Sequence, residues 1–325
     1  MKTLSAVIVT IALAAAAASA DDQNKRKKDD PGQIGNRDIG RCLNFYSPEN
    51  EMALGKQLAE EVQRQAKVND DPLISEYVNR VGQNLVRNSD AKVPFTFRVI
   101  EDDVPNAFAL PGGYIFVHTG LLKIADEEDE LAGAMAHEIA HVAARHMTCH
   151  ATKSQLAGLL SLPLGAVLGG WGGWAARQGA AAGLPAMLMS FSRSDESEAD
   201  FLGVQYMYAA GYDPNGTISI LEKLESLQRT KPGLMARVYS THPMDSSRID
   251  KTQQEIQRIL HSKPEYVVST SEYHDIRARL IANDRRKGDE KDGRPRLRVA
   301  PGSGKPDQQD TEDGRPTIRR RDLME

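Results

Sequence analysis

The sequence predicts a mainly helical α+β domain with a small β-sheet next to the helix that carries its main chemical motif. Three observations predict this class. Two helical patterns come first, strand-like segments follow between residues 95 and 117, and the chain is mostly helical from Glu127 onward. Strands that alternated singly with helices would instead indicate a parallel α/β sheet, and the sequence does not show that order.

Both early helices begin with a clear cap. Ser47-Pro48 and Asp71-Pro72 each place an N-cap residue before a proline, and proline fits the first helical position because its missing N–H has no partner there. Apolar residues then recur at helical spacing in each segment. In the second helix they are Ile74, Val78, Val81 and Leu85.

The strand signals lie close together. Phe95, Phe97 and Val99 alternate with polar residues, which is typical of a half-buried strand. Residues 106–110 and 114–117 are two further strand-like runs, and the Pro-Gly-Gly between them predicts a tight turn. This pair of strands stands directly before the long helical part of the chain.

The ends of the chain differ from its middle. Residues 1–20 combine a Lys, an apolar run and small residues before Asp21, which predicts a cleaved secretory signal peptide rather than a retained membrane anchor. Residues 21–40 are highly charged and predict a solvated leader. Residues 281–325 predict a disordered charged tail, because they cannot bury enough apolar surface to offset the entropy of ordering. Residues 41–280 remain as one domain.

Composition excludes several classes of protein. The chain has 325 residues and a formal net charge of −4, so a broad basic surface for nucleic acid is not expected. A mean hydropathy of −0.48 excludes a polytopic membrane protein. Two cysteines are too few for a disulfide scaffold or a four-thiolate zinc site.

The main motif is His137-Glu138-x-x-His141 in an Ala-rich helix. Residues four apart share one helix face, so both imidazoles can bind one metal ion. Glu138 lies one position from His137 and is placed to take a proton from a water at that metal. The alternative is a pair of core histidines, each of which would need its own hydrogen-bond partner.

A catalytic zinc needs a third protein ligand and an open position. The residue six positions after His141 is Met147, so a third histidine is missing there. His146 and His150 are four apart, but no Glu follows His146, and we interpret both as surface histidines or as residues behind the ligands.

An acidic segment downstream is the better source of the third ligand. Glu196 and Asp200 are four apart at the start of a helix, so they share a face. One can coordinate the metal while the other orients a histidine or the water. An acidic first turn also suits the helix dipole without any metal.

The motif at 137–141, together with the segment Ser-Arg-x-x-Glu196-x-Glu-Ala-Asp200, resembles the CAAX-prenyl-protease/HtpX-type zinc endopeptidases, a branch of the gluzincins. The resemblance covers about residues 45–275 and is closer to the exported periplasmic quality-control members. It implies a gluzincin metallopeptidase domain with one Zn²⁺ per chain.

The resemblance also implies roles for single residues. His137, His141 and Glu196 would hold the zinc, and Glu138 would be general base and acid. Three further residues would assist at the site: Asp200 behind the ligands, and His242 and Arg248 near the substrate, where they could stabilise an oxyanion. A helix-entry turn is the alternative for His242-Pro243.

These features predict an exported, periplasmic zinc metalloendopeptidase that hydrolyses unfolded or misassembled cell-envelope proteins. Residues 107–117 offer an edge strand for an extended substrate. The alternative is a non-proteolytic chaperone or assembly factor that uses the same cleft. Some periplasmic members of the family carry C-terminal helical repeats, and a charged tail takes their place here, so recognition of client complexes through such repeats is not carried over.

Two features remain open from the sequence. Residues 154–176 lack charge and are long enough for a transmembrane helix, but Pro163 and two Gly pairs favour a helical lid that touches the membrane surface. Cys42 and Cys149 are the only cysteines, and they are either paired or both free.

Overall fold

The computed structural model describes residues 27–40, 42–161, 191–243 and 246–291, and within them it confirms a mainly helical α+β class. Its elements are η1 (Pro31–Gln33), α2 (Pro48–Gln65), α3 (Pro72–Arg87), β1 (Thr96–Ile100), β2 (Ala107–Leu110), β3 (Tyr114–His118), α4 (Thr119–Ile124), α5 (Glu128–Ala143), α6 (His146–Ser161), α10 (Arg193–Ala210), α11 (Asn215–Thr230), α12 (Pro232–Thr241), α13 (Ser246–Ile259) and α14 (Ser271–Lys291).

The sheet has three strands in the order β1-β3-β2. β2 and β3 form the expected antiparallel pair, and β1 pairs with β3 in parallel. The turn between β2 and β3 contains Gly112 and Gly113, whose φ angles are +73° and +94°. A side chain is strained in this region, so glycine permits the tight return of the chain.

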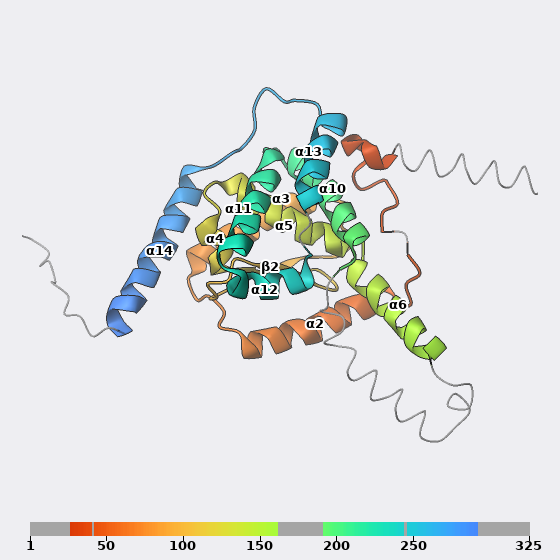
Figure 1. Ribbon diagram of the computed structural model, residues 1–325, viewed down its shortest axis with the longest axis horizontal. Helices are drawn as coiled ribbons and strands as arrows, with labels where there is room; N and C mark the ends of the chain where they lie inside the picture. Colours follow the sequence, from red (N-terminus) through yellow and green to blue (C-terminus); the bar gives the residue numbers. More distant parts are fainter. Residues whose placement is uncertain (1–26, 41, 162–190, 244–245, 292–325) are drawn as a thin grey trace, which may run out of the picture. The chain divides into compact units, whose positions relative to one another are not determined.

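The two faces of the sheet are covered by different helices. Apolar residues of one face, among them Phe97, Val99 and Ile115, pack in a core with α3 and α5. Phe116 and Leu110 on the other face pack against α2. Figure 1 shows α2 on one side of β2 and α5 on the other. The helix with the His-Glu-x-x-His motif is therefore a central element of the core.

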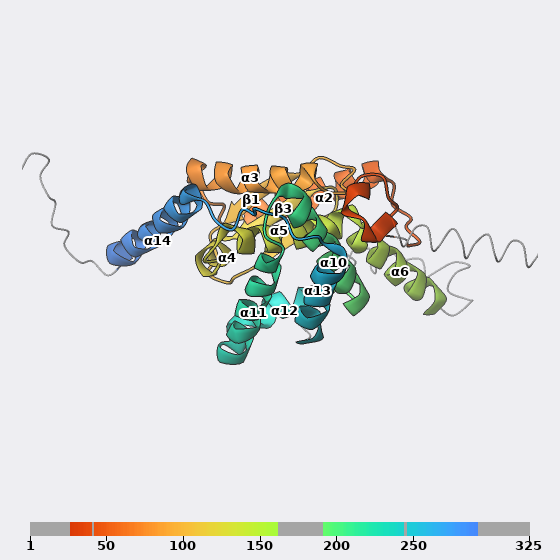
Figure 2. The same ribbon diagram turned by 90° about the horizontal axis from the view of Figure 1, so that it is seen from above.

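A further layer of helices covers α5. Figure 2 shows α11, α12 and α13 on the side of α5 that faces away from α3. α10 packs along α5, and Gly203 of α10 lies against the α5 backbone, because a Cβ at this glycine would be 3.3 Å from the His137 nitrogen. The small residue permits this close approach of the two helices.

The predicted helix starts are confirmed. The Ser47 hydroxyl accepts a hydrogen bond from the Asn50 N–H, and the Asp71 carboxylate accepts one from Leu73. At the start of α10, Ser192 and Asp195 cap each other's backbone N–H groups in a capping box.

The predicted leader is not wholly solvated, which corrects our expectation for residues 27–40. Arg37 is buried and pairs with the buried Asp90, with Nε 2.9 Å and Nη2 2.8 Å from Oδ2. Arg37 also donates to Gln205 of α10, and Tyr206 donates to Asp90. A buried charge of this kind requires a partner and hydrogen bonds, and Asp90 supplies both.

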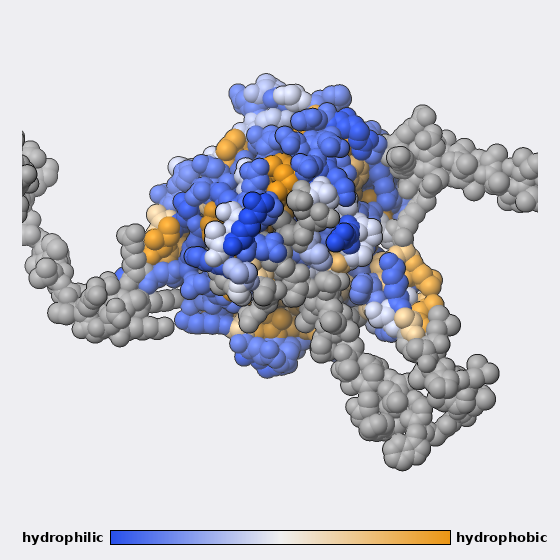
Figure 3. All heavy atoms as spheres, viewed as in Figure 1, coloured by the Kyte–Doolittle hydropathy of each residue, from blue (hydrophilic) through white to orange (hydrophobic). Residues whose placement is uncertain are grey.

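The expected boundary at residue 280 lies inside α14, which continues to Lys291, so residues 281–291 are helical rather than disordered. The signal segment 1–20 and residues 292–325 lie outside the described residues. The same holds for residues 162–176 of the expected lid at 154–176. Figure 3 shows hydrophobic surface along α6. Within the described parts of the chain, every helix falls short of the length and apolarity that crossing a membrane requires.

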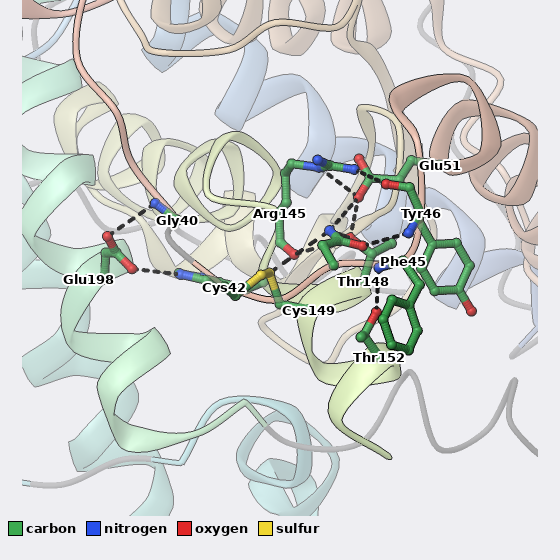
Figure 4. Close-up of a disulfide and its surroundings, with 12 residues drawn as sticks. Gly40, Cys42, Phe45, Tyr46, Glu51, Arg145, Thr148, Cys149, Thr152 and Glu198 are labelled. Atoms are coloured by element: carbon green, nitrogen blue, oxygen red, sulfur yellow. Dashed lines mark hydrogen bonds and ion pairs between the residues drawn. A yellow bond between two sulfur atoms is a disulfide. The ribbon is translucent and has the colours of Figure 1, made fainter. Parts of the chain in front are cut away.

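Cys42 and Cys149 form a disulfide, with Cα atoms 5.9 Å apart, which resolves the open question of their state. The bond joins the extended segment before α2 to α6, as Figure 4 shows. Two hydrogen bonds join the same segment to α6: Asn44 donates to the Thr148 hydroxyl at 2.8 Å, and the Phe45 N–H donates to the Thr152 hydroxyl at 3.0 Å.

We expect the Cys42→Ser/Cys149→Ser double variant to lose about 2–4 kcal/mol of unfolding free energy, because the bond links residues 107 positions apart and restricts the unfolded chain. Its melting temperature should fall by about 5–15 °C in calorimetry. Reducing agent should lower the melting temperature of the wild-type protein and leave that of the double variant unchanged. Equal melting temperatures for both proteins in oxidising buffer would contradict the prediction.

Candidate metal centre

The candidate site is built from four helices. α5 supplies His137, Glu138 and His141 from adjoining turns, and α10 supplies Glu196 and Asp200 from its first two turns. The remaining two predicted residues come from the end of α12 and the first turn of α13. They are His242 and Arg248.

The three predicted ligands lie close together, and His242 lies beside them. Ligand atoms of His137, His141, Glu196 and His242 all lie within 4.8 Å of one another. The two α5 imidazoles approach at 3.0 Å between their Nε2 atoms, and His141 Nε2 lies 3.4 Å from Glu196 Oε1. His242 Nδ1 is 3.0 Å from the same oxygen. Imidazole nitrogens and a carboxylate oxygen gathered in this way fit a divalent metal ion such as zinc.

Glu196 is held as a carboxylate. Its burial opposes ionisation, but His242, His137 and His141 outweigh that effect and hold the pKa of Glu196 well below its usual range. An ionised carboxylate is the form that coordinates a metal.

Glu138 lies beside the ligands without being one of them. It is buried, and its Oε1 is 3.5 Å from His242 Nε2. Its Oε2 has no hydrogen-bond partner among the described residues. Burial raises the pKa of Glu138 although the positive charges at His242 and His137 act against the shift. A buried oxygen without a partner is costly unless a further group, such as a water, completes the site.

Asp200 lies behind His137. Its Oδ1 is 2.9 Å from His137 Nδ1, which leaves His137 Nε2 directed at the cluster. Arg248 donates two hydrogen bonds to the same carboxylate, both at 2.8 Å. Burial opposes ionisation of Asp200, but the charge of Arg248 and the contact with His137 lower its pKa.

Arg248 also lies 2.7 Å from Glu196 Oε2 through Nη1. The buried guanidinium therefore bridges Glu196 and Asp200, two carboxylates that would otherwise repel each other.

Two residues that contact the site were not among the predicted site residues. His146 Nδ1 is 3.0 Å from His141 Nδ1, and His146 Nε2 is 3.2 Å from Glu198 Oε2. The chain turns at Arg145, with φ of +59°, and this turn brings the first residue of α6 back toward His141. The sequence left two interpretations of His146, a surface histidine or a residue behind the ligands, and its buried place beside His141 agrees with the second. Glu198 was not singled out in the sequence.

One cavity opens at the cluster. It is bounded by His137 and Glu138 and is otherwise mostly apolar, with Leu121, Ile220 and Leu221 in its wall. A second hollow lies along β2 at Phe108 and Ala109. It does not reach the ligands themselves, but its wall includes Phe191, whose ring stacks on His141 with 3.9 Å between the ring centres.

Only half of the expected edge strand at 107–117 lies at an edge of the sheet. β2 is an edge strand, whereas β3 is the central strand. The arrangement can hold an extended chain along β2 with one apolar side chain in the cavity at His137 and Glu138.

Comparison with known proteins gives a consistent picture. The chain is 32% identical over 261 residues to the β-barrel assembly-enhancing protease of Yersinia pestis (77% of this chain, 52% of the relative) and 32% identical over 240 residues to that of Escherichia coli K12 (71% and 48%). It is 34% identical over 189 residues to the mitochondrial metalloendopeptidase OMA1 of Schizosaccharomyces pombe (55% and 52%).

The chain therefore spans about half the length of these curated relatives. Its residues 72–256, which include the His-Glu-x-x-His helix and the acidic start of α10, match a peptidase family over more than half of the chain. The chain belongs to peptidase family M48.

Proposed function

We propose that this protein is a zinc-dependent metalloendopeptidase. The observation that carries the proposal is the convergence of His137, His141 and Glu196 beside the buried Glu138, at an apolar cavity that His137 and Glu138 line. Membership of a peptidase family and the metalloendopeptidase named among the relatives support the same activity.

His137, His141 and Glu196 would hold the zinc, and His242 lies beside them, with Nδ1 3.0 Å from Glu196 Oε1. A bound zinc ion would act as a Lewis acid and would lower the pKa of a water molecule toward neutrality. Glu138 would take a proton from the attacking water and deliver it to the leaving amine nitrogen. Its raised pKa suits this role, because the carboxylate is then a stronger base toward the water and keeps the accepted proton until the leaving amine takes it.

The neighbouring residues have separate roles in this proposal. Asp200 orients His137 through Nδ1, and Arg248 fixes Asp200 in turn. His242, whose ring lies 3.5 Å from Glu138, is the better placed of His242 and Arg248 to stabilise an oxyanion, since the Arg248 guanidinium already bridges two carboxylates.

Unfolded proteins are the substrate class that the cavities favour. A strand edge binds extended backbone with little dependence on sequence, and an apolar pocket accepts side chains that folded proteins bury. The signal-like residues 1–20 and the relatives named β-barrel assembly-enhancing protease support the cell envelope as the place of action, with the periplasm as compartment and misassembled proteins as clients. Contact of 154–176 with a membrane surface remains part of this proposal.

A non-proteolytic chaperone is the weaker candidate. Holding a client requires only the apolar cavity, whereas this site also places at the cluster the buried carboxyl group of Glu138, one oxygen of which has no hydrogen-bond partner among the described residues. That arrangement has a clear use in hydrolysis and none in passive binding.

We expect Glu138→Gln to lower casein cleavage about 100-fold or more, because the amide cannot accept a proton. The variant should retain its zinc, since Glu138 is not one of the ligands. The measurement combines metal analysis with release of labelled casein fragments.

Glu127→Gln serves as the matched control, because it changes a half-buried Glu that lies just before the same helix and outside the cluster, and it should leave cleavage unchanged. Chelation should abolish cleavage by the wild type. Undiminished cleavage by a zinc-loaded Glu138→Gln protein would contradict the mechanism and favour another base.

We also expect zinc affinity to rise with pH. Burial opposes a charge on His137, but its contacts with Asp200 and Glu196 outweigh this and raise the pKa of His137 to about 10. At pH 6 to 8, below this pKa, His137 of the metal-free protein carries a proton that a metal must displace. The apparent zinc Kd should therefore fall about tenfold per pH unit.

Competition with a chromophoric chelator at pH 6, 7 and 8 measures this dependence. Asp200→Asn removes a contact that raises the pKa of His137, so its zinc Kd should vary less with pH. A wild-type Kd that did not change over this range would show that His137 is already neutral.

A further inference from the structure

A chain of three side chains leads from the candidate metal ligands to the N-terminal segment. His141 directs Nε2 at the cluster, and its other ring nitrogen, Nδ1, lies 3.0 Å from His146 Nδ1. The second nitrogen of His146 lies 3.2 Å from Glu198 Oε2. His146 is buried and lies at the first position of α6, while Glu198 comes from α10.

Only one assignment of protons to the ring nitrogens of His141 and His146 agrees with these contacts when His141 binds a metal. A metal needs the Nε2 lone pair, so the proton of neutral His141 is on Nδ1 and is donated. His146 Nδ1 must then be the acceptor, and a neutral His146 carries its proton on Nε2. That proton is donated to Glu198, which accepts it as a carboxylate. In each contact from His141 through His146 to Glu198, a donor therefore faces an acceptor.

Glu198 is itself fixed from the N-terminal side. Lys28 Nζ lies 3.0 Å from Glu198 Oε1, and the Gly40 N–H donates to the same oxygen at 3.4 Å, as Figure 4 shows for Gly40. The buried Arg37 anchors this segment and donates to the Lys28 carbonyl oxygen at 2.7 Å. The disulfide at Cys42 then ties the segment to the helix that carries His146.

The two α5 histidines therefore differ in how they are supported. His137 contacts a carboxylate, Asp200, directly. For His141 the carboxylate is one residue further away, with His146 between. A carboxylate behind a ligating histidine fixes its tautomer and orientation and strengthens its binding to the metal.

We propose that His146 and Glu198 are positioning residues of the metal centre, which fix His141 as the Nδ1–H tautomer with Nε2 free for the metal. This inference rests on the proposed binding of zinc by His141. The two residues contact no substrate in this scheme, and their effect is on metal affinity.

Zinc Kd values of the full-length protein test the proposal by competition with a chelator of known affinity. Glu198→Gln should weaken zinc binding about 10-fold. His146→Leu, which removes the hydrogen bonds that connect His141 to Glu198, should weaken it up to about 100-fold. Glu51→Gln is the matched control. It removes a buried carboxylate that contacts Arg145 and Thr148 on another side of α6, so its zinc Kd should equal that of the wild type.

Equal zinc Kd values for the wild type, Glu198→Gln and His146→Leu would overturn the proposal. Circular dichroism and melting temperatures identify a variant that fails to fold, and the wild-type protein then provides the second test. In the zinc-loaded protein with ¹⁵N-labelled histidines, NMR should show His146 protonated at Nε2 and unprotonated at Nδ1. A proton on His146 Nδ1 would overturn the proposal without any variant.

The outcomes separate this inference from the proposed function. A protein that binds zinc and shows the expected tautomers without cleaving casein would contradict the endopeptidase activity and support the positioning role of His146 and Glu198. A zinc-bound protein that cleaves casein but has the other His146 tautomer would contradict only this positioning role. A wild-type protein that takes up no zinc would contradict both.

Discussion

The close packing of α5 against α10 is the constraint on which the site depends. The helices are separated by a long stretch of chain, yet His137 and His141 on one must meet Glu196 and Asp200 on the other. Small residues permit the approach: α5 is rich in alanine, and a Cβ at Gly203 would press on the His137 backbone. A larger side chain there would separate the imidazoles from the carboxylates, so the metal site and the core share the same packing.

Buried charge is the second constraint. Glu138, Glu196 and Asp200 are all buried within the centre, and charges removed from water are costly unless they are paired. Arg248 offsets much of this cost because one guanidinium contacts both Glu196 and Asp200. Histidines contact the same carboxylates from the other side. The same pairing keeps Glu196 and Asp200 ionised, which is the state that a metal and its ligands require.

Local patterns in the sequence were sufficient for much of this architecture. Caps at Ser47 and Asp71 and the turn at Gly112 and Gly113 depend on neighbouring residues, so they could be predicted position by position. The ligand spacing in α5 was predictable for the same reason. The parallel pairing of β1 with β3 was not, because it joins segments whose register is fixed by the whole core.

The contacts around Glu198 and Arg37 show where such patterns fail. Helical periodicity indicates which residues of α10 share a face, but it does not indicate that α6 turns back at Arg145 and places His146 beside Glu198. The charge of residues 27–40 agrees with the structure in that Arg37 is the only one of them that is buried. It does not show that Arg37 pairs with the buried Asp90. A buried Asp90 without a partner would be costly, so the pairing favours burial of Arg37, and the segment around Arg37 then lies against the core.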